Sequence, residues 1–407
     1  MTDPQLPSKG NRLTAFLGVS VEVISILFIS RLVVDTSARF FMPFLPEISS
    51  GLGLTVAGFS WILGVRSLIG LVSPMIGALA DQRGRRLMMT LALGLRGLSL
   101  LGLTICQGWW SLLPMLLLNL SAAAFYPVLR AYVSDLVSYQ RRGRALAAVD
   151  ASFPTAGIVG LPLVGWLIEI GSWKLPILAL AGLCLVNGVI LTFSLPKTEI
   201  KSDHSRILRS IWTLSKQPKV LASIAVSTLL LNAFTLFILF WAFLLNERFN
   251  FSPLQIGVTG TAIGIAELFG LLLAGMIVDR IGKRRGTLVG LLISLMFFVA
   301  FLLVQDSLNL ILLLMILYTV SLEFAITSSI PLISEQVIEN RATLFSLISF
   351  GNTIGEGIAP PLFTFLWTRG GTPAVVLMGA GLILLSLLLV QKFIFDSQES
   401  TQLKGIG

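Results

Sequence analysis

The stretches GALADQRGRR (residues 77–86) and GMIVDRIGKRR (residues 275–285) decide the fold, because they repeat one polar pattern at an offset of 198 residues. Two further pairs keep nearly the same offset: Pro162 and Pro360 at 198, and the segments that start at Val133 and Ile333 at 200. Three matches at nearly one spacing indicate an internal duplication. The chain is therefore expected to consist of two halves that are built alike.

The composition of the 407 residues predicts that these halves lie in a membrane. Hydrophobic residues make up 55% of the chain and charged residues only 12%, about half of the roughly 25% that is usual in soluble domains. So few charges cannot cover a water-exposed surface of this size. A disordered chain is excluded by the same numbers, and a disulfide scaffold by the presence of only two cysteines, Cys106 and Cys184.

A helix that spans a membrane needs about 20 apolar residues. Twelve segments meet that length, with the approximate bounds 20–45, 55–79, 88–108, 111–137, 144–170, 174–195, 220–246, 252–278, 286–304, 308–335, 342–368 and 373–395. The first thirteen residues are polar and no cleavage site follows, so we expect the first helix to remain in the mature protein. The predicted fold is an all-α membrane protein of twelve transmembrane helices.

The distribution of basic residues gives the expected orientation. With both termini in the cytoplasm, 21 of the 29 Lys and Arg residues lie on the cytoplasmic side, three on the opposite side and five within the helices. Cytoplasmic loops are typically the basic ones. The formal net charge of +9 is thereby explained by topology, and we expect no nucleic-acid partner.

The duplication and the loop lengths divide the chain into a bundle of six helices at 1–195, a cytoplasmic linker at 196–219 and a second bundle at 220–407. We expect His204, the single histidine, to be a solvated residue of the linker. Two pseudo-symmetric six-helix bundles are typical of secondary transporters, whose substrate site lies between the halves near the middle of the membrane.

The repeated motif resembles the loop signature of the major facilitator superfamily, G-x-L-x-D-x-x-G-R-[RK], and the resemblance covers the whole chain. In the first half the signature is met by Gly77, Leu79, Asp81, Gly84, Arg85 and Arg86, and the second half keeps Gly275, Asp279, Gly282, Lys283 and Arg284. The resemblance implies a cytoplasmic gate built from these residues. It also implies an accompanying network at the ends of helices four and ten: Asp135, Arg142 and Arg144, mirrored by Glu335 and Arg341.

Two partial signatures resemble the drug-efflux branch of that family. Residues 43–46 read PFLP at the outer end of helix one, as in the P-x-x-P of that branch, and helix five contains a motif like that of antiporters, formed by Gly157, Gly160, Pro162 and Gly165. Leu161 is inserted before the proline and Trp166 replaces the final glycine, so close helix packing is an equal interpretation. The arginine of that branch in the outer half of helix four is missing.

Charged residues inside the predicted helices are the candidates for substrate binding and proton coupling, because such charges are costly in a membrane. Arg31, Asp35 and Arg39 lie on one face of helix one. The complete set is Asp35, Arg31, Arg39, Arg66, Arg96, Arg130, Glu267, Glu323 and Glu356. Each has a structural alternative, such as a salt bridge or a position at the membrane interface. Our hypothesis is that Asp35 and the second-half glutamates carry protons and that the first-half arginines contact the substrate.

The expected function is proton-coupled export of a small organic or drug-like molecule by alternating access. Proton-coupled uptake of an anionic or zwitterionic metabolite and lipid translocation between leaflets remain alternatives, as does a membrane sensor or scaffold that transports nothing. No nucleotide-binding loop, metal-ligand cluster or nucleophile motif is present in the sequence, so we expect no enzyme activity, no metal and no cofactor. We expect a monomer in a bacterial inner membrane, and the sequence does not identify the substrate.

Overall fold

The computed structural model describes residues 18–196, 217–337 and 341–396, together with Thr14 and Phe16. Within these ranges, the positions left out are Ser73, Pro74, Gly77, Ala78, Ala80, Asp81 and Gln305. Gly77 and Asp81 of the repeated motif, and nearly all of the expected linker with His204, therefore lie outside the described residues. The same holds for the side chain of Arg341.

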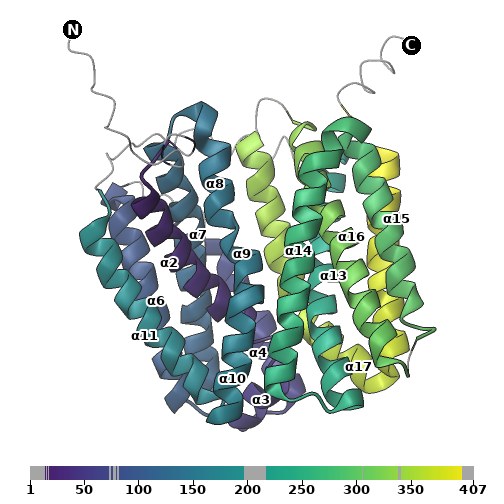
Figure 1. The fold of residues 1–407 in the computed structure, drawn as a ribbon, viewed down its shortest axis with the longest axis horizontal. Coiled ribbons are helices and arrows are strands. Elements are labelled where there is room, and N and C mark those ends of the chain that lie inside the picture. The colour runs from purple at the N-terminus through teal and green to yellow at the C-terminus, as the bar shows by residue number, and fades with distance from the viewer. Residues whose placement is uncertain are drawn as a thin grey trace.

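The described part of the chain contains helices and no strand (Figure 1), as expected from its composition. In the first half the main helices are α2 (Val21–Arg39), α3 (Leu45–Gly51), α4 (Val56–Ser67), η1 (Leu68–Val72), α6 (Arg85–Ile105), α7 (Leu112–Leu136), α8 (Arg142–Asp150), α9 (Ser152–Thr155), η4 (Ala156–Gly160), α10 (Leu161–Ile170) and α11 (Lys174–Ser194). In the second half they are α13 (Pro218–Phe249), α14 (Pro253–Ile281), α15 (Lys283–Ala300), α16 (Leu308–Ser334) and α17 (Arg341–Phe393).

Each of the twelve expected segments has a helical counterpart, although several bounds differ. The first expected segment is too long, because α2 ends at Arg39 and α3 forms a separate short helix that has Pro46 in its first turn. The last two expected segments form the continuous α17, which is broken at Gly371, where φ is 57°. By length and hydropathy, eight described helices can each cross a membrane, or nine if the bent pair Leu45–Gly51 and Val56–Val72 is one span.

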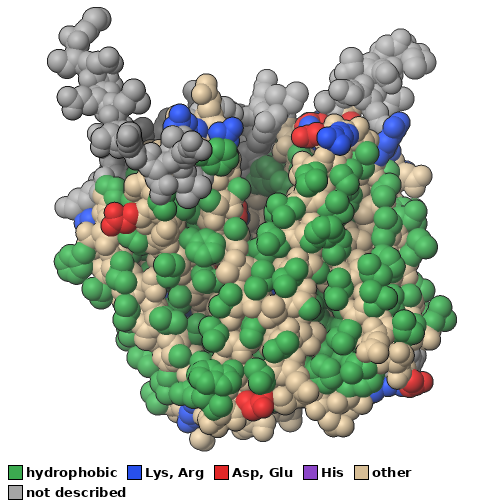
Figure 2. All heavy atoms as spheres, viewed as in Figure 1, with side chains coloured by type: hydrophobic (Ala, Val, Ile, Leu, Met, Phe, Trp, Pro, Cys, Tyr) green, Lys and Arg blue, Asp and Glu red, His purple; other side chains and the backbone are tan. Residues whose placement is uncertain are grey.

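The surface of the molecule has the distribution that lipid requires. Hydrophobic side chains cover the flank over the helices, and charged side chains gather at the two ends (Figure 2). The helix α2 begins, and α17 ends, at the same end of the molecule (Figure 1). The short helix α3 lies at the opposite end.

The two halves meet along two pairs of helices, α4 with α17 and α10 with α14. Glycines allow both contacts: a Cβ built on Gly64 would lie 2.4 Å from the carbonyl oxygen of Gly357, and one built on Gly165 would lie 2.3 Å from that of Pro253. Side chains would hold these helices apart, so the close approach depends on glycine.

Buried aromatic rings fill the end of the molecule that holds α3. Phe40, Phe41 and Phe44 follow α2, and Phe243 packs against Phe363 and Trp367 on the other side. These rings belong to one continuous core cluster. The space that remains open between the halves therefore lies toward the other end.

Candidate functional site

A cavity of about 740 Å³ lies between the two halves. It is lined by α2, α4 and α7 on one side and by α13 and α17 on the other, and it extends from Met42 and Pro360 to Phe345 near the start of α17. Six charged side chains line it: Arg31, Asp35, Arg39, Arg66, Arg130 and Glu356. Its volume falls in the range of about 300–1,000 Å³ that is usual for small-molecule sites.

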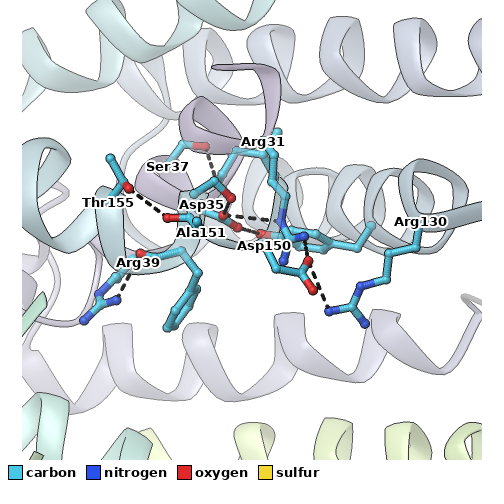
Figure 3. Close-up of polar contacts among 12 residues, drawn as sticks. Arg31, Asp35, Ser37, Arg39, Arg130, Asp150, Ala151 and Thr155 are labelled. Carbon is cyan, nitrogen blue, oxygen red and sulfur yellow. Dashed lines mark hydrogen bonds and ion pairs between the residues drawn. The ribbon is translucent and has the colours of Figure 1, made fainter. Parts of the chain in front are cut away.

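Four of the charged residues around the cavity form one network (Figure 3). Arg31 Nε lies 3.5 Å from Asp35 Oδ2, one helical turn away on α2. Arg31 also forms an ion pair with Asp150 of α8, and Arg130 Nη2 of α7 lies 3.7 Å from Asp150 Oδ1. Two cations and two carboxylates therefore balance each other and join three helices.

Asp35 is further engaged by two hydroxyl donors. The hydroxyl of Tyr126 donates to Asp35 Oδ1 at 2.8 Å, and that of Ser152 donates to Asp35 Oδ2 at 2.6 Å. The side chain of Asp35 is only 2% exposed. Burial of a carboxylate is tolerated because its lone pairs are occupied by these three partners.

Asp150 is a site residue that our sequence analysis missed. It lies within the predicted segment 144–170, so a complete count of carboxylates inside the apolar segments would have found it. Its position on α8, opposite Arg31 of α2, follows only from the packing of the helices.

Arg39 and Glu267 form a second buried ion pair, which joins the two halves. Arg39 Nη1 donates to Glu267 Oε2 at 2.9 Å, and Arg39 Nη2 donates to Glu267 Oε1. The guanidinium also lies 4.8 Å from the ring centroid of Phe153 and donates to the carbonyl oxygen of that residue at 3.4 Å. The bidentate geometry is the strong form of such a pair.

Arg66 and Glu356 differ from the other charged residues of the cavity. No hydrogen bond or ion pair joins either of them to the described part of the chain, and Arg66 Nε is buried without a partner. Arg66 on α4 is 7% exposed and stacks over Phe41 at 5.0 Å, whereas Glu356 on α17 is exposed at the cavity. The cavity thus presents one cation and one carboxylate that attract each other but form no direct ion pair or hydrogen bond.

Arg96 and Glu323 are sequence candidates that do not line the cavity. The guanidinium of Arg96 donates to Ser37 Oγ at 2.6 Å, Ser121 Oγ at 3.1 Å, Leu118 O at 3.2 Å and Val34 O at 3.1 Å. It thereby ties α6 to α2 and α7. Glu323 of α16 accepts a hydrogen bond from Thr327 at 3.3 Å and lies against Gly270 of α14.

The last residues of the repeated motif, which the structure describes in both halves, adopt the same geometry. Gly84 and Gly282 precede α6 and α15 with φ of 94° and 93°, values that favour glycine. Arg85 Nη1 then lies 2.5 Å from Asp135 Oδ2 at the end of α7, and Lys283 forms an ion pair with Glu335 at the end of α16. The internal duplication seen in the sequence therefore extends to ion pairs.

The arginine that follows each of these cations holds the last helix of its half. Arg86 Nη1 donates to Leu195 O at 2.7 Å, and Arg284 Nη2 donates to Gln391 O at 2.6 Å. The other expected gate residues lie apart from these contacts. Arg144 stacks over Phe16 at 4.5 Å, Asp279 is exposed near the end of α14, and Arg142 is the first residue of α8.

The glycines of the antiporter-like motif pack helices. A Cβ on Gly160 would lie 2.4 Å from Thr36 Oγ1 of α2, and one on Gly157 would lie 3.2 Å from Gly264 Cα of α14. Pro162 has no N–H to donate to the carbonyl of Ile158 one turn earlier, and Thr261 of α14 donates to that carbonyl at 3.0 Å. The segment Ala156–Gly160 is a π-helix, a form common near functional sites.

Comparison with known proteins places these features in a family. The model of the Major Facilitator Superfamily matches residues 27–252 and 224–405. An uncharacterized MFS-type transporter of Bacillus subtilis (strain 168), YbcL, is 24% identical over 394 residues, which cover 94% of this chain and 98% of that protein. The multidrug resistance protein MdtG of Escherichia coli O81 (strain ED1a) is 25% identical over 406 residues, which cover 94% of each chain.

Solved structures share the fold at low sequence identity. A crystal structure of a bacterial homologue of the human lysosomal transporter Spinster, inward-facing and unoccupied, matches with a TM-score of 0.77 at 13% identity, over 95% of this chain and 100% of that one. The human organic anion transporter MFSD10 matches with a TM-score of 0.67 at 18% identity, over 91% of this chain and 99% of that one. At these identities the likeness describes the fold alone.

Proposed function

Because this chain belongs to the Major Facilitator Superfamily, we propose that it exports a small organic molecule from the cell in exchange for protons. The cavity between the halves is the substrate site, and rocking of the halves exposes it to one side of the membrane at a time. Relatives named multidrug resistance proteins favour an organic, drug-like substrate.

One observation carries the proposal: Glu356 is a carboxylate at the cavity that forms no direct ion pair or hydrogen bond with the described residues. The charged groups that share the cavity with it are Arg66 on α4, Arg39, Arg31 and Asp35 on α2, and Arg130 on α7. Asp35 is already engaged by Arg31 and two hydroxyls. We therefore assign the proton exchange to Glu356 and a supporting role to the Asp35 network.

The exchange of substrate for protons follows because the two compete for the carboxylate of Glu356. With the cavity open to the cytoplasm, the ionised Glu356 binds a cationic group of the substrate. After the halves have rocked, a proton from the outer side binds Glu356 and releases that group. Substrate and proton cannot be bound together, which is the condition for antiport.

The orientation that this cycle needs agrees with the charge distribution. The cavity extends toward the end of the molecule that carries the repeated basic motifs, and basic ends face the cytoplasm. We propose that both termini are cytoplasmic, that 1–195 and 220–407 are the rocking units joined by 196–219, and that the protein works as a monomer in a bacterial inner membrane.

A reconstituted system tests the function. Purified protein is first screened by thermal shift against drugs, organic anions and sugars, since a ligand that binds the folded state raises its melting temperature. The best ligand is then added to proteoliposomes that have an acidic lumen and an entrapped pH indicator. We expect the ligand to be taken up while protons leave, in the wild type and in the matched control Glu22→Gln, an exposed residue at the start of α2, and the coupling to be lost in Glu356→Gln.

Two results would contradict the proposal. Uptake of the ligand at the same rate with and without the pH gradient would exclude proton coupling. Uptake that requires the opposite gradient would mean that ligand and proton move in the same direction, as in proton-coupled uptake.

A further inference from the structure

All but two of the charged residues that line the cavity form direct ion pairs. Arg31 and Arg130 are neutralised by Asp35 and Asp150, and Arg39 is neutralised by Glu267. The two remaining charges of the lining are Arg66 and Glu356, which form no ion pair with the described residues. The charged groups left for a ligand are therefore one guanidinium and one carboxylate.

Arg66 is a buried cation with a hydrogen-bond donor that an anionic group of a ligand would satisfy. Its side chain is 93% buried, given its 7% exposure, and its Nε has no acceptor. The ring of Phe41, 5.0 Å from the guanidinium, provides a cation–π contact but no hydrogen-bond acceptor. A buried guanidinium with unused donors is costly until an anionic group satisfies them.

Arg66 and Glu356 lie at nearly the same height along the helices α4 and α17. The two residues flank the point where α4 touches α17: Gly64, two residues before Arg66, approaches the carbonyl of Gly357, which directly follows Glu356. Two residues of an α-helix span about 3 Å along its axis. A ligand group with both signs of charge can therefore bridge the two side chains, which themselves remain unpaired.

Most of the other side chains that line the cavity are apolar, beside uncharged polar ones such as Asn119, Ser349 and Thr353. Phe234 and Ile238 of α13, Phe345 and Phe350 of α17 and Leu63 of α4 line it. These side chains suit an aromatic or aliphatic body and give it no polar partner.

We propose that the substrate is an amphiphile with a zwitterionic head group, whose anion binds Arg66, whose cation binds Glu356 and whose apolar body lies along the phenylalanines. This inference rests on the proposed function, because it uses the same cavity. Arg66 and Glu356 attract each other without a direct contact. A simple cation bound to Glu356 would leave Arg66 without its counter-charge, and a simple anion bound to Arg66 would leave Glu356 without its own. A zwitterion satisfies both residues at once.

Three dansyl probes with one common body test the head group. Nε-dansyl-lysine carries an ammonium and a carboxylate; dansylcadaverine is the same molecule without the carboxylate, and dansyl-aminocaproate is the same molecule without the ammonium. Binding to the purified full-length protein in detergent is measured by fluorescence titration at neutral pH without a gradient. We expect Nε-dansyl-lysine to bind about tenfold or more tightly than either relative, as one charge-assisted contact contributes that much.

Reciprocal variants assign the two charges. In Arg66→Gln the zwitterion should lose its advantage over dansylcadaverine, and in Glu356→Gln it should lose its advantage over dansyl-aminocaproate. The controls Arg369→Gln and Glu22→Gln remove the same charges away from the cavity and should keep the wild-type order. Equal weakening of all three probes in both variants would overturn the assignment, because it would show no recognition of the individual charges.

Other outcomes separate this inference from the proposed function. Failure of Nε-dansyl-lysine to bind, or tighter binding of dansylcadaverine, would overturn the head-group site while leaving proton-driven export intact. Conversely, a preference for the zwitterion without any exchange of protons in proteoliposomes would support the site and refute the coupling.

Discussion

Arg39 of α2 and Glu267 of α14 form a bidentate ion pair across the two halves, and both side chains are more than nine-tenths buried. Loss of one partner from a buried pair leaves the other charge uncompensated, at a cost of about 3–5 kcal/mol. We therefore predict that Arg39→Met and Glu267→Leu each lower the melting temperature of the purified protein strongly.

The double variant Arg39→Met with Glu267→Leu provides the control for that prediction. It removes both charges and keeps side chains of comparable volume, so we expect it to be more stable than either single variant. Additive losses in the double variant would mean that the two residues do not stabilise the protein as a pair.

Gly165 of α10 is the second test of the contact between the halves. A Cβ at this position would lie 2.3 Å from the carbonyl oxygen of Pro253, a backbone atom that cannot move away alone. We predict that Gly165→Ala lowers the stability by about 1–3 kcal/mol, the usual cost of overpacking. Thermal unfolding in detergent measures the change.

Gly182 of α11 is the matched control, because a Cβ there would meet no atom within 4 Å. Alanine favours a helix over glycine by about 0.5–1 kcal/mol, so Gly182→Ala should leave the stability unchanged or raise it. Equal effects of the two alanines would contradict the close packing of α10 on α14.

Arg96 is the subject of a third prediction, which separates structure from transport. Its guanidinium reaches four acceptors on α2 and α7, and the three donors of a lysine cannot reproduce that geometry. Arg96→Lys should cost about 2 kcal/mol of stability and leave the dependence of transport on the pH gradient unchanged. A change in that dependence would return Arg96 to the candidates for substrate binding and proton coupling.

The amino-acid sequence was sufficient to predict the fold for a definite reason. Lipid imposes a length and a hydropathy on each spanning helix. The two copies of the repeat end with the same local geometry, with Gly84 and Gly282 at nearly equal φ. The breaks at Arg39 and in η4 were missed, because they depend on prolines and on contacts with other helices.

The site was predicted only in part, because sequence identifies buried charges but not their partners. Arg31 and Asp35 were expected on one face of a helix, and they form an ion pair there. Asp150 was missed. Arg96, like Arg66, is an arginine inside an apolar segment, but the donors of Arg96 are satisfied by hydrogen bonds away from the cavity. Whether a buried arginine is satisfied depends on the packing of three helices, which no local pattern records.

The pair Lys283 and Glu335 carries the last prediction, because both charges lie at unfavourable helix ends. Lys283 is the first residue of α15, where the helix dipole is positive, and Glu335 is the C-cap of α16, where it is negative. Glu335→Lys alone places two cations together and should lower the melting temperature, as should Lys283→Glu alone with two carboxylates.

The double exchange restores the attraction and also places each charge at its favourable helix end, a gain of about 0.3–1 kcal/mol per residue. We therefore expect the double variant to be at least as stable as the wild type in thermal unfolding, and a double variant no better than the singles would contradict direct pairing of the two residues.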